Sequence, residues 1–504
     1  MRQKKQWTVT LATLALATCG AVAMGASSSV AGTLQSHPGG AHLVRHAPGY
    51  WTELAKTLGA TFTGTPAVWL APDDTATILW QRHIHNTNYT YEDILVDAAG
   101  TTVGAPVSIF GGTGWLGLTD DPVLVSDGSS PEIIFSGGRD DSNSDPYSKG
   151  CVYGAVAAKP QWTLQGWSLS DDCYNPIPGG TETRTGALSA AWGGSSGGHS
   201  AVLYRIGTSV TIPATGADDH VLTPGGGDVG RAAEAADIAG NDNVFVAWYQ
   251  FFSKPSGDDG FYVKDATSNG PVRKAPGSGT NSVNNLYAAA ALAMANTNTH
   301  SGIFLAYCSN GTTCSLRLWR VGAAKALTVP DSSPASDVAI SAGPDGRIWV
   351  AWYNHSTNDV ATVRTNTADT AFGPVETYAT PCFEDGLIGL SGGSYGRLDV
   401  ALQCIDNSQL RTQDYITQSL AGLSIRASRA VIKNGVTNTV TFEVTDAGDP
   451  VAGATVRVDG KVKTTGGSGT VSITFPKGSA AGKYAVTASA ANYFSAHGGL
   501  DIEG

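Results

Sequence analysis

Residues 336–355 read SDVAISAGPDGRIWVAWYNH and contain the features of a two-stranded β-hairpin. Polar and apolar side chains alternate over residues 337–340, as they do in a strand with one buried face. Residues 343–346 form the sequence GPDG, whose members tolerate the tight or positive-φ backbone of turns. Residues 347–353 are rich in β-branched and aromatic side chains, which favours a returning strand. This stretch therefore predicts a hairpin.

A short strand, a polar or Gly-rich turn and an apolar strand ending in a bulky residue follow one another seven times along the chain. The second strands end at residues 80, 135, 204, 248, 307, 352 and 402, which stand 44 to 69 positions apart. A period of about fifty residues with several strands per unit predicts a β-propeller, because one blade cannot bury both of its faces alone. We predict an all-β fold with a seven-bladed propeller; six or eight blades are the alternatives. In the third and fifth units we expect the first strands at residues 187–190 and 289–292.

The seventh unit has a third strand at residues 409–415 but no fourth strand before the composition changes. Residues 49–55, GYWTELA, precede the first blade and have the pattern of an outer strand. An N-terminal strand that completes the last blade would remove an exposed sheet edge. We therefore expect the propeller, residues 49–418, to be closed by pairing of its two chain ends.

The N-terminal residues 1–31 have the pattern of a secretory signal peptide. Three cations at positions 2, 4 and 5 precede an apolar run, and small residues follow it. Cleavage after Ala31 and cleavage after Ala23 both fit this pattern, and residues 32–48 then form a linker. The sequence LATC that ends at Cys19 also resembles a lipoprotein box, so lipid attachment at Cys19 stays open.

No later apolar run approaches the ~18 residues that a membrane span requires, so we expect no transmembrane segment. The chain is therefore expected to be secreted or held at the cell surface, and to be a monomer. Without residues 1–31 it has 28 Lys and Arg against 42 Asp and Glu, a formal charge of −14. Such an acidic surface repels polyphosphate, which argues against nucleic acid and anionic lipid as partners.

The cysteines agree with an exported protein. Apart from Cys19 there are six, and they fall into local pairs that predict three disulfides: Cys151–Cys173, Cys308–Cys314 and Cys382–Cys404. Each pair lies within one proposed blade or at its boundary, as expected in an oxidising compartment. None of the pairs has the close Cys and His spacing of a zinc site.

Residues 419–504 form regularly spaced short strands and predict a small β-sandwich. Within them, residues 449–456 (DPVAGATV), followed by Asp459-Gly460 and Gly469, resemble a bacterial Ig-like or carboxypeptidase-regulatory-like module. The resemblance implies a C-terminal Ig-like domain that acts as a spacer or stalk and carries no catalytic residue.

The propeller region has a resemblance of its own. Residues 343–352 (GPDGRIWVAW) and 244–249 (VFVAWY) resemble the repeat of sialidase-like (BNR-type) β-propellers. This resemblance implies a secreted protein that handles glycans. The Asp-box of that family, Ser-x-Asp-x-Gly-x-x-Trp, is missing from every unit, and no Arg-Ile-Pro motif precedes the first blade. The fold alone does not establish an activity.

In a propeller, first strands begin and second strands end on one face, which we call the mouth face. We expect there a set of polar and aromatic side chains that could bind a ligand: Arg82, His83, Arg139, Arg205, Tyr249, Tyr353, Asn354 and His355. Arginines from successive blades could grip a carboxylate, and the two tyrosines could stack on a sugar. Trp80, Trp248 and Trp352, at equivalent positions, are expected to pack between blades.

Two functions from different classes follow from this arrangement. The first is non-catalytic recognition of a carbohydrate or surface ligand at the mouth face. The alternative is glycoside hydrolysis at a divergent sialidase-like site, which needs a pair of carboxylates. The candidate catalytic acids are Asp120, Asp121, Glu234, Asp337 and Asp385. A propeller that serves only as a scaffold is a third option, because polar strand ends reach solvent in any propeller.

A loop between residues 141 and 145 could bind a cation, although no cofactor is otherwise expected. Asp141, Asn143 and Asp145 alternate in the manner of a calcium loop. However, Pro146 stands where an EF-hand has glycine, and a glutamate at the usual later position is missing. A loop exposed to solvent without Ca²⁺ is the alternative.

Overall fold

The computed structural model describes most of the chain from residue 49 onward. The described residues are 49–58, 64–71, 73, 75–84, 88–96, 102–109, 115–116, 122–126, 131–139, 151–158, 161–165, 178–196, 199–208, 220–223, 227–252, 258–268, 270–279, 292–297, 299–311, 313–382, 385–392, 396–406 and 411–504. The expected signal peptide, the linker and Cys19 lie outside them. None of the helices in the described part is long and apolar enough to cross a membrane.

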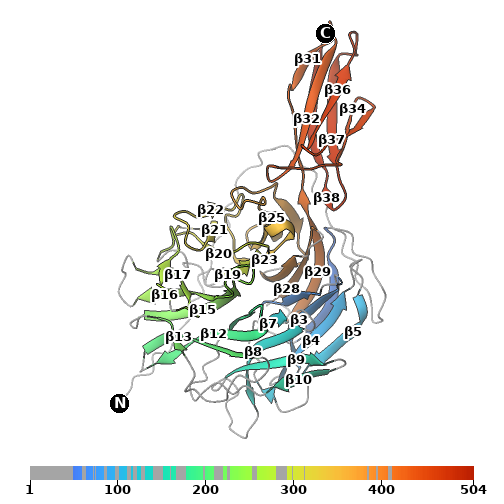
Figure 1. Cartoon of the computed structure of the whole chain (residues 1–504). Helices are drawn as coiled ribbons and strands as arrows, with labels where there is room; N and C mark the ends of the chain where they lie inside the picture. The colour runs from blue at the N-terminus through green and yellow to red at the C-terminus, as the bar shows by residue number, and fades with distance from the viewer. Residues whose placement is uncertain are drawn as a thin grey trace, which may run out of the picture. The chain divides into compact units, whose positions relative to one another are not determined.

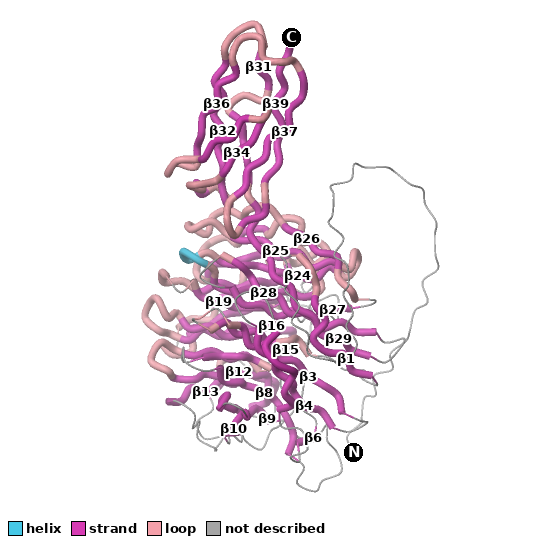
Figure 2. Tube along the Cα trace, turned by 90° about the vertical axis from the view of Figure 1, so that its right-hand side faces the viewer, coloured by secondary structure: helices cyan, strands magenta, loops and turns pink. Residues whose placement is uncertain are grey.

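The chain is an all-β protein, in which strands make up nearly all the regular structure (Figure 2). Between Thr52 and Gly422 the described strands form seven antiparallel sheets. The first three sheets are β2 (Ala67–Leu70), β3 (Ala76–Ile84), β4 (Asn88–Val96) and β5 (Thr102–Ile109); then β6 (Trp115–Leu116), β7 (Val123–Ser126), β8 (Pro131–Arg139), β9 (Cys151–Ala158) and β10 (Gln161–Gln165); then β11 (Gly179–Glu182), β12 (Ala187–Ser196), β13 (His199–Thr208) and β14 (His220–Val221).

The other four sheets follow the same plan. They are β15 (Gly227–Ala236), β16 (Val244–Phe252), β17 (Gly260–Asp265) and β18 (Arg273–Lys274); β19 (Leu292–Asn296), β20 (Ile303–Cys308), β21 (Leu316–Arg320) and β22 (Leu327–Thr328); β23 (Asp337–Ala342), β24 (Ile348–Asn354), β25 (Asp359–Arg364) and β26 (Glu376–Ala379); and β27 (Asp385–Gly392), β28 (Arg397–Asp406), β29 (Arg411–Gly422) and β1 (Thr52–Leu58).

The sheets follow one another in a ring, the arrangement of a β-propeller (Figure 1). The innermost strands touch in the order β2, β7, β11, β15, β19, β23 and β27, and β27 touches β2 again. The last sheet is completed by β1, which pairs antiparallel with β29, so that Thr52 lies opposite Ile416 and Glu53 opposite Tyr415. The expectation that the N-terminal strand closes the ring is confirmed.

The hydrophobic cores lie between consecutive sheets, which explains why the strands are rich in Val, Ile and Trp. One core packs Phe304 and Leu318 of the fifth sheet against Val338 and Val350 of the sixth. Trp80, Trp248 and Trp352 are fully buried in such cores, as expected. Both faces of each sheet are thus covered by its neighbours.

The hairpin formed by β23 and β24 has the expected turn. Asp337 pairs with Tyr353 at one end of the ladder, and Ala342 pairs with Ile348 at the other. Between the strands, residues 344–346 form a short 3₁₀ turn in which Asp345 has a φ of 58° and Gly346 a φ of 79°. The Asp-Gly pair supplies this left-handed backbone at low cost.

The third sheet differs from the prediction. The residues expected to form its first strand, 187–190, lie in the second strand β12, and β11 is the innermost strand. In the fifth sheet, β19 begins at Leu292, where the expected first strand was to end.

Residues 423–504 form two further sheets. The first contains β30 (Ser424–Ala427), β32 (Asn438–Asp446), β33 (Asp449–Pro450) and β36 (Thr470–Phe475). The second contains β31 (Val431–Lys433), β34 (Thr455–Val458), β35 (Lys461–Thr464), β37 (Gly482–Ser489) and β39 (Ala496–Glu503), and β38 (Tyr493–Phe494) pairs with β29. Val440, Phe442, Val456 and Val486 join both sheets in one core. We call this part the C-terminal sandwich; its assignment as an Ig-like domain stays a prediction.

The expected boundary between residues 418 and 419 falls inside β29, which continues to Gly422. At this strand end, Ala421 and Gly422 pair in parallel with Tyr493 and Phe494 of β38. The last strand of the propeller therefore runs directly into backbone pairing with the sandwich.

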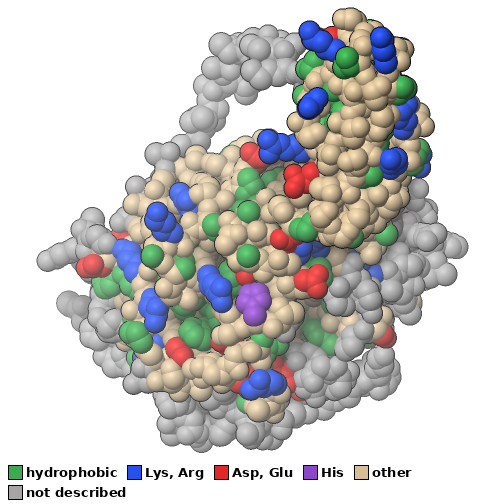
Figure 3. Space-filling model, turned by 45° about the horizontal axis from the view of Figure 1, so that its top comes forward, with side chains coloured by type: hydrophobic (Ala, Val, Ile, Leu, Met, Phe, Trp, Pro, Cys, Tyr) green, Lys and Arg blue, Asp and Glu red, His purple; other side chains and the backbone are tan. Residues whose placement is uncertain are grey.

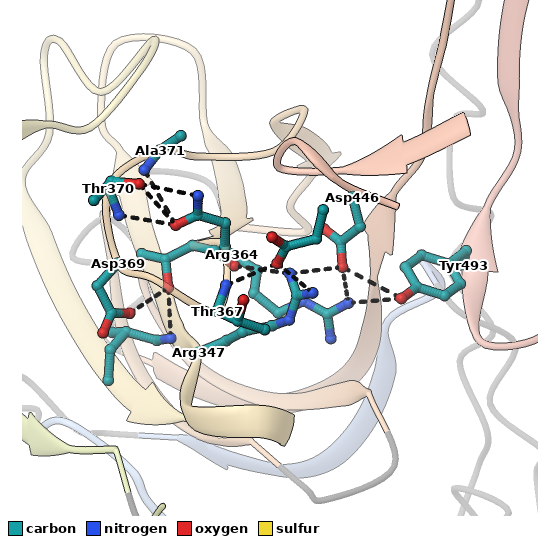
Figure 4. A network of polar contacts seen from close by, with 12 residues as sticks. Arg347, Arg364, Thr367, Asp369, Thr370, Ala371, Asp446 and Tyr493 are labelled. Atoms are coloured by element: carbon teal, nitrogen blue, oxygen red, sulfur yellow. Dashed lines mark hydrogen bonds and ion pairs between the residues drawn. The ribbon is translucent and has the colours of Figure 1, made fainter. Parts of the chain in front are cut away.

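A buried ionic network also joins the sandwich to the sixth sheet (Figure 4). Asp446 Oδ2 accepts a hydrogen bond from Arg364 and forms an ion pair with Arg347 Nη1 at 3.1 Å. Arg347 Nη2 also lies 2.7 Å from Asp449 Oδ2. The Arg364 guanidinium stands over the rings of Trp349 and Tyr493, at 4.9 and 5.5 Å from their centroids. Charges this deeply buried require such pairing to be tolerated.

Candidate functional site

The mouth face carries both disulfides of the described part of the chain. Cys308, the last residue of β20, bonds to Cys314 across a short hairpin. Cys382, in the connection before β27, bonds to Cys404 near the end of β28. Both predicted pairs are thus confirmed, whereas the pair of Cys151 cannot be followed, because Cys173 lies outside the described residues. Cys151 itself begins β9 on this same face.

The longest connections between the strands described in the ring also belong to the mouth face. Residues 166–178 link β10 to β11, and residues 275–291 link β18 to β19. Long loops carried by a rigid scaffold are where propellers and other folds place their binding residues. The opposite face is where β29 ends and leads into the sandwich. Loop length and cross-linking therefore both single out the mouth face.

The backbone positions of the expected arginine cluster, Arg82, Arg139 and Arg205, are described, and they show which of these residues lie at the mouth face. Arg82 and His83 lie near the end of β3, and Arg139 is the last residue of β8, so these three reach the mouth end of second strands. Arg205 does not, because it lies in β13, the third strand of its sheet, opposite Ala190. The expectation for Arg205 failed because the first strand of its sheet was assigned one strand too late.

The two candidate acids whose side chains are described are both buried between sheets. Glu234 of β15 is 6% exposed, and its Oε1 accepts a hydrogen bond from the Ser189 hydroxyl of β12 at 3.0 Å. Burial raises the pKa of Glu234 well above its usual value, which the Ser189 bond offsets only in part. Glu234 thus connects two sheets instead of facing the mouth.

Asp337 has a similar structural role in the sixth sheet. It is 1% exposed, and its Oδ2 accepts a hydrogen bond from the Ile388 N–H of β27 at 2.9 Å. The carboxylate therefore joins two neighbouring innermost strands. Asp385 is the first residue of β27, but its side chain is outside the description, as are Asp120 and Asp121 altogether.

The predicted calcium loop, Asp141, Asn143 and Asp145, also lies outside the described residues. Within the residues that are described, no group of three His, Cys, Asp or Glu side chains could hold a metal ion.

Tyr249 and Tyr353 are not available for stacking on a sugar, contrary to expectation. Tyr249 packs edge-on against Phe261, at 5.1 Å between ring centroids, and burial raises its pKa to about 12. Tyr353 is fully buried and donates its hydroxyl hydrogen to Asn358 Oδ1. The expectation assumed that the side opposite the tryptophans was open. In a propeller, the next sheet covers that side as well.

A set of side chains, which we call the mouth arc, lies on the fourth, fifth and sixth sheets: Phe251, Asn310 and His355, which are exposed, and Asn354, which is half-buried. The Phe251 side chain is 41% exposed near the end of β16. The next residue is anchored, because Asp259 Oδ1 accepts the Phe252 N–H at 2.8 Å. An exposed phenyl ring on an anchored strand end offers a flat apolar surface to a ligand.

The other members of the mouth arc are also held by backbone contacts. Asn310 lies within the hairpin that the Cys308–Cys314 bond closes, and its N–H bonds to the Gly277 carbonyl at 2.8 Å. Asn354 Oδ1 accepts the Ser356 N–H at 3.0 Å, an Asx turn that positions His355. Asn354 and His355 were expected at the mouth face, whereas Phe251 and Asn310 were missed. Two signals pointed to them: a third aromatic position after Trp248, and a hairpin between paired cysteines.

Comparisons with known proteins return only distant likenesses. No family model matches the sequence, and neither does any curated protein. Among solved structures, it is similar to the polysaccharide lyase Uly1 (TM-score 0.43, 10% identity, over 71% of this chain and 90% of the lyase). It is similar to an α-L-arabinanase of Penicillium chrysogenum complexed with arabinobiose (TM-score 0.45, 10% identity, over 65% of this chain and 99% of the arabinanase). It is also similar to the β-propeller domain of the trilobed protease of Pyrococcus furiosus (TM-score 0.41, 9% identity, over 71% of this chain and 98% of that domain). The function must be argued from this chain's own residues.

Proposed function

We propose that the protein is an extracellular, non-catalytic β-propeller that binds a carbohydrate at its mouth face. The observation that carries the proposal is the mouth arc, in which accessible side chains stand on backbone held by the Cys308–Cys314 disulfide and by hydrogen bonds. Loops that are ordered before binding lose less conformational entropy when a ligand arrives. Disulfides also agree with an oxidising compartment, as secretion requires.

The ligand chemistry follows from the side chains of the arc. Phe251 supplies an apolar ring, and Asn310 and Asn354 supply amide groups that can both donate and accept hydrogen bonds. Sugars present the same combination of C–H faces and hydroxyl groups. An aromatic ring and amide groups suit an uncharged portion of a glycan.

Hydrolysis receives less support from the carboxylates. Glycosidases need two carboxyl groups that face one substrate. Glu234 and Asp337, the two candidates with described side chains, are instead buried and bonded to groups of neighbouring sheets. We therefore favour binding without cleavage.

The test is a glycan array on the purified full chain, followed by calorimetric titration with the best glycan. We expect Phe251→Ala to weaken binding about tenfold or more, because exposed aromatic anchors dominate small interfaces. Val431→Ala is the matched control, since Val431 is another exposed apolar side chain, 48% exposed, on the C-terminal sandwich. Equal glycan binding by Phe251→Ala and the unmodified chain would refute the proposal that the mouth arc is the binding site. Turnover of chromogenic glycosides would refute the non-catalytic assignment.

A further inference from the structure

The C-terminal sandwich has the opposite charge to the rest of the protein. Residues 423–504 contain eight Lys and Arg against six Asp and Glu, whereas residues 32–422 contain 20 against 36. On the face seen in Figure 3, Lys and Arg side chains are prominent on the sandwich. A local charge of this kind acts within about 8–10 Å in physiological salt, so the distant acids do not cancel it.

Two of the six acids in the sandwich are paired with arginines of the sixth sheet. Asp446 and Asp449 are paired with Arg347 and Arg364 at the junction with the sixth sheet. This leaves eight cations and four acids for the remaining surface of the sandwich.

Each of those four acids lies beside a cation. Across the strands, Lys483 lies opposite Asp501, Lys433 opposite Glu503, and Arg426 opposite Glu443. The fourth acid, Asp459, is 3.5 Å from Lys461 Nζ. The cations without such an acidic neighbour are Arg429, Arg457, Lys463 and Lys477.

Two of these four lie with Lys461 where β35 meets β36. Lys463 Nζ donates to the Ser472 carbonyl of β36 at 2.8 Å, and Lys461 Nζ stands 5.5 Å from the centroid of Phe475. Lys477 follows Phe475 by two residues. We call this set, Lys461, Lys463 and Lys477, the basic edge. Arg457 is not part of it, because it pairs with Val462 and its side chain therefore lies on the other face of the sheet.

Lysines on an edge strand can serve merely to prevent pairing with another chain. That role accounts for Lys461 and Lys463, because β35 is the outermost strand of its sheet. It does not account for Lys477, which lies beyond the end of β36. The three lysines are better explained by a common anionic partner.

We propose that the basic edge binds an anionic polysaccharide. A row of exposed cations with a single acid among them matches a chain that repeats carboxylate or sulfate groups, and lysines contribute point charges that need no fixed register. The choice of a polysaccharide among polyanions rests on the proposed function.

The test measures retention of the full chain on immobilised polygalacturonate and on dextran sulfate, with neutral dextran as the blank, at 50 and 150 mM NaCl. The first variant combines Lys461→Gln, Lys463→Gln and Lys477→Gln. The matched control combines Arg426→Gln, Lys433→Gln and Lys483→Gln, which removes the same net charge from cations outside the basic edge. We expect the first variant to bind about tenfold more weakly and the control to lose much less, with binding that falls as salt rises.

Three outcomes would overturn the proposal. One is equal loss in the two triple variants, which would mean that only net charge matters. Another is no retention of the unmodified chain on either polymer at 50 mM NaCl. The third is binding to vesicles with anionic phospholipid in place of the polymers. The Phe251→Ala variant distinguishes the two proposed binding sites. It should lose glycan binding at the mouth arc but keep the retention on dextran sulfate that the basic edge provides.

Discussion

At the scale of single residues, Glu234 shows how burial changes the chemistry of a carboxyl group. It lies between the third and fourth sheets with Ser189 as its hydrogen-bond donor, and burial raises its pKa well above the usual value of 4.5. A carboxyl group with a higher pKa in the folded than in the unfolded state is held more tightly in its protonated form by the fold. Its stabilising contribution is therefore present at low pH and lost as the pH rises through the folded pKa.

Glu234→Gln should consequently make the protein more stable than the unmodified chain at alkaline pH, but not at pH 4.5. The free energy of unfolding of the unmodified chain should fall by up to about 1.4 kcal/mol per pH unit, over the pH range in which Glu234 is protonated in the folded state and ionised in the unfolded state. Urea denaturation at pH 4.5, 7 and 9 measures this difference. Glu443→Gln, on the exposed side of β32, is the control and should show no such trend. Parallel pH profiles for Glu234→Gln and the unmodified chain would contradict the argument.

At the scale of elements, the innermost strands approach one another so closely that some positions have no room for a side chain. A Cβ atom on Gly389 of β27 would lie 1.8 Å from the Pro66 carbonyl oxygen beside β2. This contact belongs to the last and first sheets, where the ring closes. Neither group can move aside without shifting a strand, because the obstructing atom is backbone.

Gly389→Ala should therefore destabilise the propeller by about 3 kcal/mol, as overpacking of a closely packed region does. The midpoint of urea denaturation measures the loss. Gly435→Ala is the matched control, since a Cβ there would meet no atom within 4 Å. A Gly389→Ala chain as stable as the Gly435→Ala chain would show that the strands at the closure can separate without cost.

The same crowding explains which elements could be predicted from sequence. Hairpins such as β23–β24 were predictable, because apolar strands and an Asp-Gly turn are local features. The strand β11, GGTE, was missed because it lacks an apolar pattern. Its glycines are required because residues distant in the sequence leave no room for a side chain. A Cβ on Gly180 would lie 2.6 Å from Ile134 Cδ1, and a Cβ on Gly179 would lie 2.9 Å from Ala233 Cα. No local pattern encodes such contacts.

The candidate site was predictable to a similar extent. Alternation along β16 and β24 correctly placed the tryptophans between sheets, but it could not tell that the other side is covered too. Tyr249 and Tyr353 were therefore assigned to the surface. Phe251 lies only two residues beyond Tyr249, where the strand reaches the mouth end, and is exposed. Exposure thus depends on position along the strand as well as on its alternating sides.

At the scale of the whole molecule, the ionic junction couples the C-terminal sandwich to the propeller. Asp446 forms ion pairs with two buried arginines, Arg347 and Arg364, and accepts a hydrogen bond from the Tyr493 hydroxyl at 3.3 Å. Burial, followed by the charge of Asp446, raises the pKa of Tyr493, so its hydroxyl stays a donor. A spacer free to swing would not need charges buried at its base. The junction therefore favours a sandwich that unfolds together with the propeller.

Asp446→Ala should separate the two unfolding events. Without this carboxylate, Arg364 is left buried beside aromatic rings with no acid to compensate its charge, which costs about 3–5 kcal/mol. Scanning calorimetry should then change from one cooperative transition to two, because the interface no longer holds the parts together. Asp459→Asn is the control, since Asp459 pairs with Lys461 at a partly exposed site and such pairs contribute at most about 1 kcal/mol. Two transitions already in the unmodified chain would mean that the buried ion pairs join the parts without coupling their stability. One transition in both variants would mean that the β29–β38 pairing suffices by itself.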